Sequence, residues 1–286
     1  MVTVFLVLLV KICVGALILS IGVGSTFDDV LYLWRRPRLL LRALLAMYVL
    51  VPAATVLLVA VWPLDPAVKA AFLVLAVSAG APLLPRKLEK FGSGQFIFSI
   101  VVTTSLLAII VVPLWISLLA WHFEVSTEIS PLTVAAMIAK AFLLPLVVGM
   151  ILGRLLPELA RRFADRATAL AGIALMLASV ALLIMHWRIL LEVHLSGMTA
   201  LVALMLIALA IGHTLGGPEA QNRPALAIAC ATRHIGIAVI VATTFPGPRT
   251  VVILAAYLIA STAVSIPYLK WRQHAAQRDK AIEGRI

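Results

Sequence analysis

The chain has 286 residues, of which 63% are hydrophobic and only 12% are charged, and its mean hydropathy is +1.13. These values exclude an ordinary soluble globular domain and a disordered chain, because both classes contain many more charged residues. The formal net charge of +11 does not indicate nucleic-acid binding, since basic residues beside membrane spans produce the same excess.

Long apolar stretches predict the fold class. A membrane span needs roughly 20 mainly apolar residues, and about nine such stretches follow one another along the chain. We therefore predict an all-α integral membrane protein. The first stretch carries Lys11 in its middle and lacks a basic start, so it is interpreted as a retained span and not as a signal peptide. The predicted spans are residues 2–24, 38–62, 67–90, 95–121, 131–153, 167–187, 196–216, 224–245 and 248–270.

The placement of Lys and Arg predicts the orientation. With the N-terminus outside, most of the 23 basic residues lie in loops on the cytoplasmic side or in a cytoplasmic tail at 271–286. We expect a cell (inner) membrane protein with a cytoplasmic C-terminus and with membrane lipid, but not nucleic acid, as a partner. Residues 282–285 match a protease recognition sequence used in expression tags and are set aside. The outside segments then hold only Lys69, Arg188 and Arg249.

Motifs for catalysis are absent. The sequence contains no His-Glu-x-x-His, no Gly-x-Ser-x-Gly and no phosphate-binding glycine loop. Its six histidines have no metal-site spacing, and its two cysteines both lie in predicted spans. We predict that the protein is not an enzyme and has no metal or cofactor; the sequence says nothing of protein partners.

Two predicted spans are interrupted near their centres. In the third, Gly80, Ala81 and Pro82 combine a flexible residue with one that removes a backbone donor. In the eighth, residues 231–236 bring Thr232, Arg233, His234 and Gly236 to mid-depth. The two spans are five apart, so they run antiparallel, as expected of an inverted repeat with its binding site at the breaks.

Arg233 is the most informative residue. An arginine at the centre of a span costs about 2.5 to 3.5 kcal/mol on insertion scales, so it normally faces a cavity, a partner or a ligand. No Asp or Glu lies in the interior of a predicted span to neutralise it. Two interpretations stay open: the guanidinium meets an anionic ligand, or it donates to carbonyls freed at the opposite break. His234, with an ordinary pKa near 6.5, is either a proton carrier or a packed side chain.

Other polar residues in the spans are weaker candidates. Thr103, Thr104 and Ser105 carry hydroxyls at mid-depth in the fourth span, where they face the site or serve helix packing. Lys11 and Lys140 line a pathway, extend toward the headgroups, or are buried as neutral amines.

The chain resembles the bile acid:sodium symporter family, within a superfamily that includes arsenite exporters and auxin-efflux-like carriers. The resemblance covers nearly the whole chain and depends on the order of several short motifs. These are Gly22-Val23-Gly24 followed by Arg35-Arg36-Pro37, the broken helix near Gly80, residues 103–108, Gly236-Ile237-Ala238, and Phe245-Pro246.

The resemblance implies an architecture of inverted repeats in which two broken helices cross, divided into a panel and a core domain. The panel corresponds to about 2–24 and 131–187, and the core to about 38–121 and 196–270.

At its sodium positions the chain departs from this family. The Ser-Asn pair of sodium-binding relatives aligns with Leu84-Pro85, their Glu with Ala229, and their Gln-Asn pair with Arg233-His234. A hard cation prefers oxygen ligands, which these residues do not offer, so sodium binding is doubtful.

We therefore expect a secondary transporter of a small organic anion that works by alternating access, with Arg233 in place of a coupling sodium. A proton- or sodium-coupled symporter or an exporter of the same family is one alternative. A membrane sensor or ligand-binding regulator is another.

Overall fold

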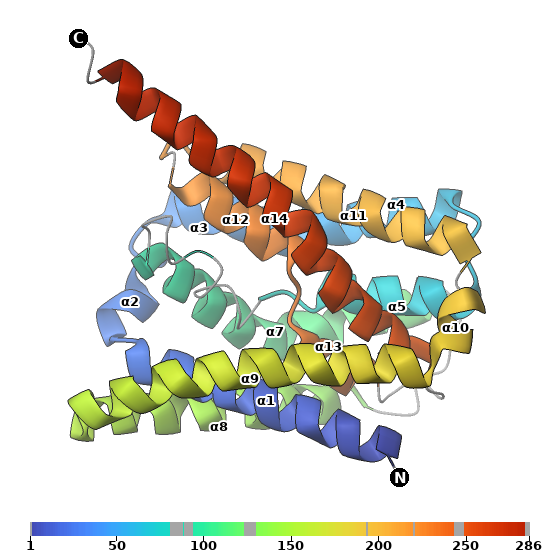
Figure 1. Cartoon of the computed structure of the whole chain (residues 1–286), viewed down its shortest axis with the longest axis horizontal. Helices are drawn as coiled ribbons and strands as arrows, with labels where there is room; N and C mark the ends of the chain where they lie inside the picture. Colours follow the sequence, from blue (N-terminus) through green and yellow to red (C-terminus); the bar gives the residue numbers. More distant parts are fainter. Residues whose placement is uncertain are drawn as a thin grey trace.

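The computed structural model describes residues 2–80, 88, 94–122, 130–192, 194–219, 221–242 and 249–283, and within these ranges every regular element is a helix (Figure 1). The first helices are α1 (Val2–Gly24), α2 (Phe27–Leu31), α3 (Pro37–Leu44), the π-helix η1 (Leu45–Leu50), α4 (Val51–Val61) and α5 (Pro66–Val77). The others are α7 (Gly94–His122), α8 (Pro131–Leu155), α9 (Pro157–Met185), α10 (Trp187–Glu192), α11 (His194–Leu215), α12 (Asn222–Ala231), α13 (Ile235–Ala242) and α14 (Arg249–Glu283).

Six helical segments in this part of the chain are long and apolar enough to cross a membrane. Each overlaps a predicted span, which confirms an all-α membrane protein; the number of nine spans stays a prediction. The six are Pro37–Val61, Gly94–Leu119, Pro131–Leu155, Arg162–Met185, Leu195–Leu215 and Val252–Ala275.

Prolines in the segments between the spans explain where several helices begin. The helices α3, α5, α8 and α9 each have a proline in their first turn, where its missing N–H leaves no hydrogen bond unmade. By contrast, α14 meets no glycine or further proline between Pro267 and Gly284. It therefore continues to Glu283 through most of the segment that the sequence analysis treats as a tail.

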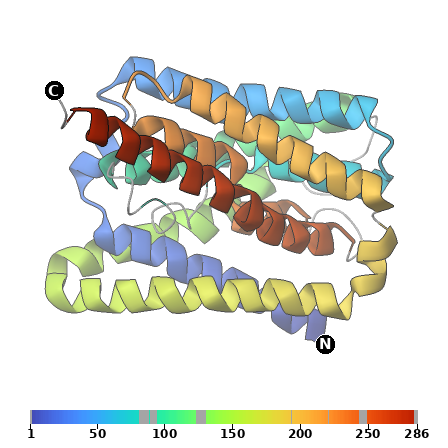
Figure 2. The ribbon, with the colours of Figure 1, turned by 45° about the horizontal axis from the view of Figure 1, so that its top comes forward.

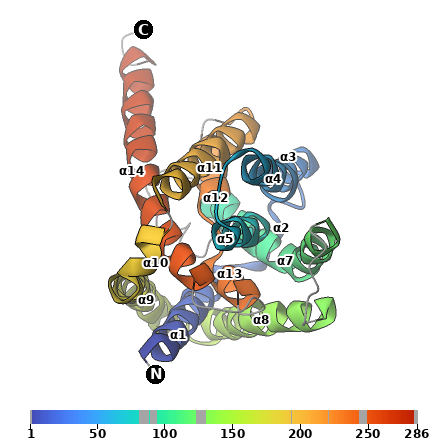
Figure 3. The same cartoon turned by 90° about the vertical axis from the view of Figure 1, so that its right-hand side faces the viewer.

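α1, α8 and α9 pack together along one side of the molecule (Figures 1 and 2). Glycines allow α1 and α8 to approach closely, because a Cβ added to Gly149 would lie 3.0 Å from the Cα of Gly22. On the opposite side lie α4 and α11, and α5, α12 and α13 lie between these two sides (Figure 3). α13 packs against α1 and α8 on the first side and also against α5 and α14.

Candidate functional site

The ends of two interrupted helices meet inside the bundle. α5 ends at Val77, and α12 ends at Ala231 before α13 starts at Ile235. The backbone N–H of His234 donates to the carbonyl of Ser78 over 2.9 Å, which joins the two breaks directly. Backbone groups freed at the interruptions thus satisfy one another, as helix ends buried away from water must.

Gly80 explains why the first break can sit against α7. Its φ is +88°, a left-handed conformation that side chains other than glycine rarely adopt. A Cβ at this position would lie 2.8 Å from the Thr104 Oγ1 and 3.0 Å from the Ser105 Oγ. The structure therefore brings Gly80 onto two of the predicted hydroxyl residues. Ala81 and Pro82, also predicted here, lie outside the described residues.

Arg233 is buried, with 3% of its surface exposed, and its Nη1 donates to the carbonyl oxygen of Met47 over 3.2 Å. The π-helix accounts for this free acceptor. The N–H of Val51 bonds five residues back to Ala46, so the next donor in this register is residue 52. That residue is Pro52, which has no N–H. The carbonyl of Met47 is therefore left for the guanidinium.

A second carbonyl beside Pro52 is also capped by a side chain. The Trp115 Nε1–H donates to the carbonyl of Tyr48 over 3.1 Å, and the Tyr48 hydroxyl donates to the carbonyl of Thr104. The irregular turn is thus tied to α7 as well as to Arg233, and such local widening of a helix often marks a functional position.

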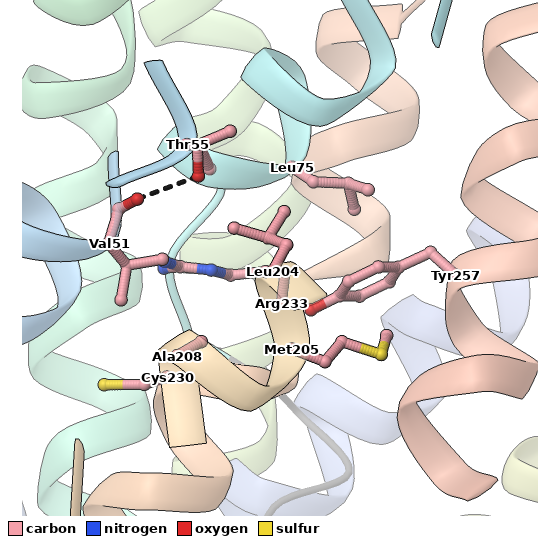
Figure 4. A pocket seen from close by; sticks show the side chains of 10 residues that line it. Val51, Thr55, Leu75, Leu204, Met205, Ala208, Cys230, Arg233 and Tyr257 are labelled. Carbon is pink, nitrogen blue, oxygen red and sulfur yellow. Dashed lines mark hydrogen bonds between the residues drawn. The ribbon is translucent and has the colours of Figure 1, made fainter. Parts of the chain in front are cut away.

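The side chain of Arg233 points toward α4 and away from the α1–α8–α9 side. Figure 4 shows it extending toward Val51 across a small cavity of about 10 Å³, about the volume that one water molecule needs. The cavity is lined by Val51, Thr55, Leu75, Ala76, Leu204, Met205, Ala208, Cys230, Arg233 and Tyr257. The Tyr257 hydroxyl is engaged, because it donates to the carbonyl of Ala231 at the end of α12.

No carboxylate neutralises Arg233 within the described ranges. The ion pairs there join Arg35 to Asp28 and Arg36 to Glu219, both far more exposed. The Nη2 of Arg233 makes no hydrogen bond with any described residue. A buried cation without a counter-charge raises the electrostatic potential around it, because the interior screens charge less than water does.

His234, the next residue, faces the other way. Its ring makes a T-shaped contact with Phe142 of α8, at 6.3 Å between centroids and an interplanar angle of 75°. Its Nδ1 accepts from the N–H of Ile237 over 3.2 Å and caps the start of α13. An Nδ1 that accepts a hydrogen bond carries no proton, so the neutral ring holds its proton on Nε2.

Gly236 brings this break close to α1. A Cβ added to Gly236 would overlap the side chain of Val14, and it would lie 3.1 Å from the Cε1 of His234. The absence of a side chain at Gly236 thus lets α13 pack against α1 while leaving room for the imidazole.

Several buried polar atoms on α7 and at the second break have no hydrogen-bond partner among the described residues: Thr103 Oγ1, Ser105 Oγ, Thr232 Oγ1, Arg233 Nη2 and His234 Nε2. Leaving such a group unsatisfied costs about 1 to 3 kcal/mol. Two of the five atoms are N–H donors, three are hydroxyls that can donate, and none is a carboxylate.

The two lysines that the sequence analysis considered lie elsewhere. Lys11 on α1 and Lys140 on α8 are both exposed. Lys140 precedes the buried Phe142 by two residues, which places it on roughly the opposite face of α8. Their role in a pathway stays a prediction.

Met47, Ser78 and Tyr257 contribute hydrogen bonds at the breaks and were not predicted as site residues from the sequence. The first two act through backbone carbonyls, which leave no trace in residue identity. The only available signal was Pro52, whose missing N–H frees a carbonyl one turn earlier.

Among the described residues, no group of three or more His, Cys, Asp or Glu side chains is placed to hold a metal ion. Ala229, which aligns with the Glu of sodium-binding relatives, is fully buried in α12. The region contains hydroxyl and backbone carbonyl oxygens that a cation such as sodium could bind, but it also contains the positively charged guanidinium of Arg233, which repels a cation.

A comparison with known families identifies the family to which the chain is similar. The model of the Sodium Bile acid symporter family matches residues 11–193, which include the α5 break but end before the α12–α13 break. No curated protein matches the chain.

Proposed function

Because the chain belongs to the Sodium Bile acid symporter family, a family of membrane transporters, we propose that it is a secondary active transporter of a small organic anion. Its all-helical, multi-pass membrane architecture fits this class. Alternating access is the mechanism that we propose, with substrate bound near the midplane at the broken helices.

The packing supports a proposed division into two moving parts. The panel would be α1, α8 and α9, which contact one another, and the core would be formed by the α3–α4 helix, α5, α7 and α11–α14. We further propose nine spans, in the inner membrane, with the N-terminus outside and the two broken helices related by an inverted repeat. The two parts touch where α13 contacts α1 and α8, where α7 contacts α8 and where α14 contacts α9, so these are the contacts that a relative movement would change.

In this proposal Arg233 takes the place of the coupling sodium. The supporting observation is its position: a buried guanidinium that donates to the Met47 carbonyl, with a free nitrogen and no carboxylate partner in the described chain. Arginine stays protonated at any accessible pH, so the charge is permanent. Because its side chain points into the core, Arg233 acts on the substrate through its electrostatic potential.

The group that contacts the substrate is then His234. Its Nε2–H is buried without a partner, and its ring faces Phe142 across the proposed boundary between core and panel. The unpaired hydroxyls of Thr103, Ser105 and Thr232 are further donors for a carboxylate.

A thermal-shift screen tests this function. Purified protein is heated with a set of carboxylates, including steroid acids and keto acids, and with their neutral amides, first in sodium chloride and then in potassium chloride. We expect a carboxylate to raise the melting temperature equally in both salts, while its amide does not. A shift that needs sodium would overturn the substitution by Arg233, and equal shifts with neutral amides would overturn an anion site.

Substitution of His234 tests its proposed contact with the substrate. Replacement by alanine should lower uptake of the identified anion about 10- to 100-fold, because one donor to a buried charged group is lost. His234→Gln, which keeps an N–H donor, should lose less. Uptake by the unchanged protein should vary little between about pH 5.5 and 8, since Nδ1 is held as an acceptor. A steep pH dependence that His234→Ala removes would instead favour the proton-coupled alternative.

A further inference from the structure

A group of aromatic rings joins the end of α11 to α14. The Nδ1 of His213 lies 2.8 Å from the Tyr268 hydroxyl, and the two rings are edge to face with centroids 5.9 Å apart. The Trp271 ring lies 5.7 Å from His213 and 5.9 Å from Tyr268. We refer to these three residues as the aromatic cluster.

Two arginines lie at the same end of α11 and α14 as the aromatic cluster. The Arg272 guanidinium lies 5.4 Å from the centre of the Trp271 ring, and its Nε is buried with no partner among the described residues. Arg223 donates from Nε to the carbonyl of Gly217 over 3.1 Å. A Cβ added to Gly216 would lie 2.5 Å from the Cα of Arg223, so Arg223 packs against the end of α11, one turn beyond His213.

The acidic residue of the described chain that lies nearest in sequence to Arg223 is already engaged. This residue, Glu219, forms an ion pair with Arg36 and accepts from the side-chain N–H of Asn222. In the resolved ion pairs, neither Arg223 nor Arg272 has a carboxylate partner. Among the described residues, the site therefore contains two arginines and no carboxylate paired with either.

The aromatic cluster lies at the depth of a membrane interface. His213 is near the end of the apolar segment Leu195–Leu215, and Trp271 is near the end of Val252–Ala275. Trp271 is 55% exposed, and from this region α14 projects beyond the other helices (Figure 3). Trp and Tyr are typical of the boundary between hydrocarbon and headgroups, where Arg meets lipid phosphates.

We propose that the aromatic cluster, together with Arg223 and Arg272, binds the phosphate of an anionic phospholipid headgroup. Arginine suits this role because its planar donors match phosphate oxygens. The half-exposed Trp271 would lie against the glycerol and upper acyl chain, which a free phosphate ion does not possess. This site is separate from the broken helices and does not depend on the transport proposal.

The test measures lipid binding by native mass spectrometry of the full chain. The probes are phosphatidylglycerol, neutral phosphatidylcholine and inorganic phosphate. Arg272→Gln removes the charge, Arg272→Lys keeps the charge without the planar donors, and Arg278→Gln is the matched control, since Arg278 is an exposed residue farther along α14. Circular dichroism melting checks that each variant is folded.

We expect phosphatidylglycerol to bind in preference to phosphatidylcholine. Arg272→Gln should weaken that binding about fivefold, Arg272→Lys should weaken it less, and Arg278→Gln should leave it unchanged. Equal losses for Arg272→Gln and Arg278→Gln would overturn the site, because they indicate diffuse attraction to the helix. Equal binding of the neutral lipid, or competition by inorganic phosphate as strong as that by the lipid, would overturn the assignment to a phospholipid.

Discussion

Arg233→Gln should reduce uptake of the anionic substrate to background and lower the melting temperature. The substitution removes the permanent charge, and the shorter side chain leaves the Met47 carbonyl unsatisfied in the core. The stability lost with that hydrogen bond is about 1 to 3 kcal/mol. Radiolabelled uptake in proteoliposomes and thermal unfolding in detergent measure the two effects separately.

Arg233→Lys and Arg188→Gln are the matched variants. Lysine keeps the charge but not the planar donors, so partial uptake is expected. Arg188 is an exposed residue on α10, and its loss should leave both readouts unchanged. If Arg233→Gln transports as well as the parent protein, the fixed-charge role is wrong. If it melts lower yet transports normally, Arg233 acts only by holding the carbonyl.

Gly80→Ala should be the most disruptive single-methyl change at the broken helices. The left-handed φ of +88° costs an alanine about 1 to 2 kcal/mol. In addition, the new Cβ would lie 2.8 Å from the Thr104 Oγ1, and overpacking of this kind typically costs about 1 to 3 kcal/mol. We therefore expect a lower melting temperature and a large loss of uptake.

Gly15→Ala is the control for Gly80→Ala. A Cβ at Gly15 meets no atom within 4 Å, and alanine favours a helix by about 0.5 to 1 kcal/mol over glycine. Gly80→Ala combined with Thr104→Ala should recover part of the stability, because the overlap is relieved while the strained φ remains. A Gly80→Ala variant that melts and transports like the parent would contradict the tight packing of this break against α7.

At the second break, Arg233 and His234 have different proposed roles. Arg233 points into the core toward η1 and α4, whereas His234 faces Phe142 on α8. A charge kept inside the core acts on both open states of a carrier alike, while a donor at the boundary meets the substrate. The Arg233 and His234 variants should therefore differ in kind: the first changes stability and potential, the second mainly affinity.

Much of this site was visible in the sequence. The interruptions at Gly80 and at residues 231–236 were predicted from glycine, proline and polar residues within apolar stretches, and the structure joins them through the His234–Ser78 hydrogen bond. The hydroxyls of Thr104 and Ser105 lie next to Gly80, and whether they face a substrate or serve helix packing stays open. Arg233 donates to a carbonyl of η1 and not to one at the α5 break, so the acceptor is one that neither interpretation named, and contact with a substrate stays a prediction.

The amino-acid sequence alone determined that the chain is an all-helical membrane protein and where its apolar helices are interrupted, because hydrophobic length and backbone breakers act locally. Only the tertiary structure decided which way the side chains at the helix interruptions point. Consecutive residues of an unwound segment do not follow a helical period, so their directions depend on neighbours. The acceptor of Arg233 lies 186 residues away, and it is free only because a π-helical register places Pro52 opposite Met47. Such a register arises from packing between helices, which no local pattern encodes.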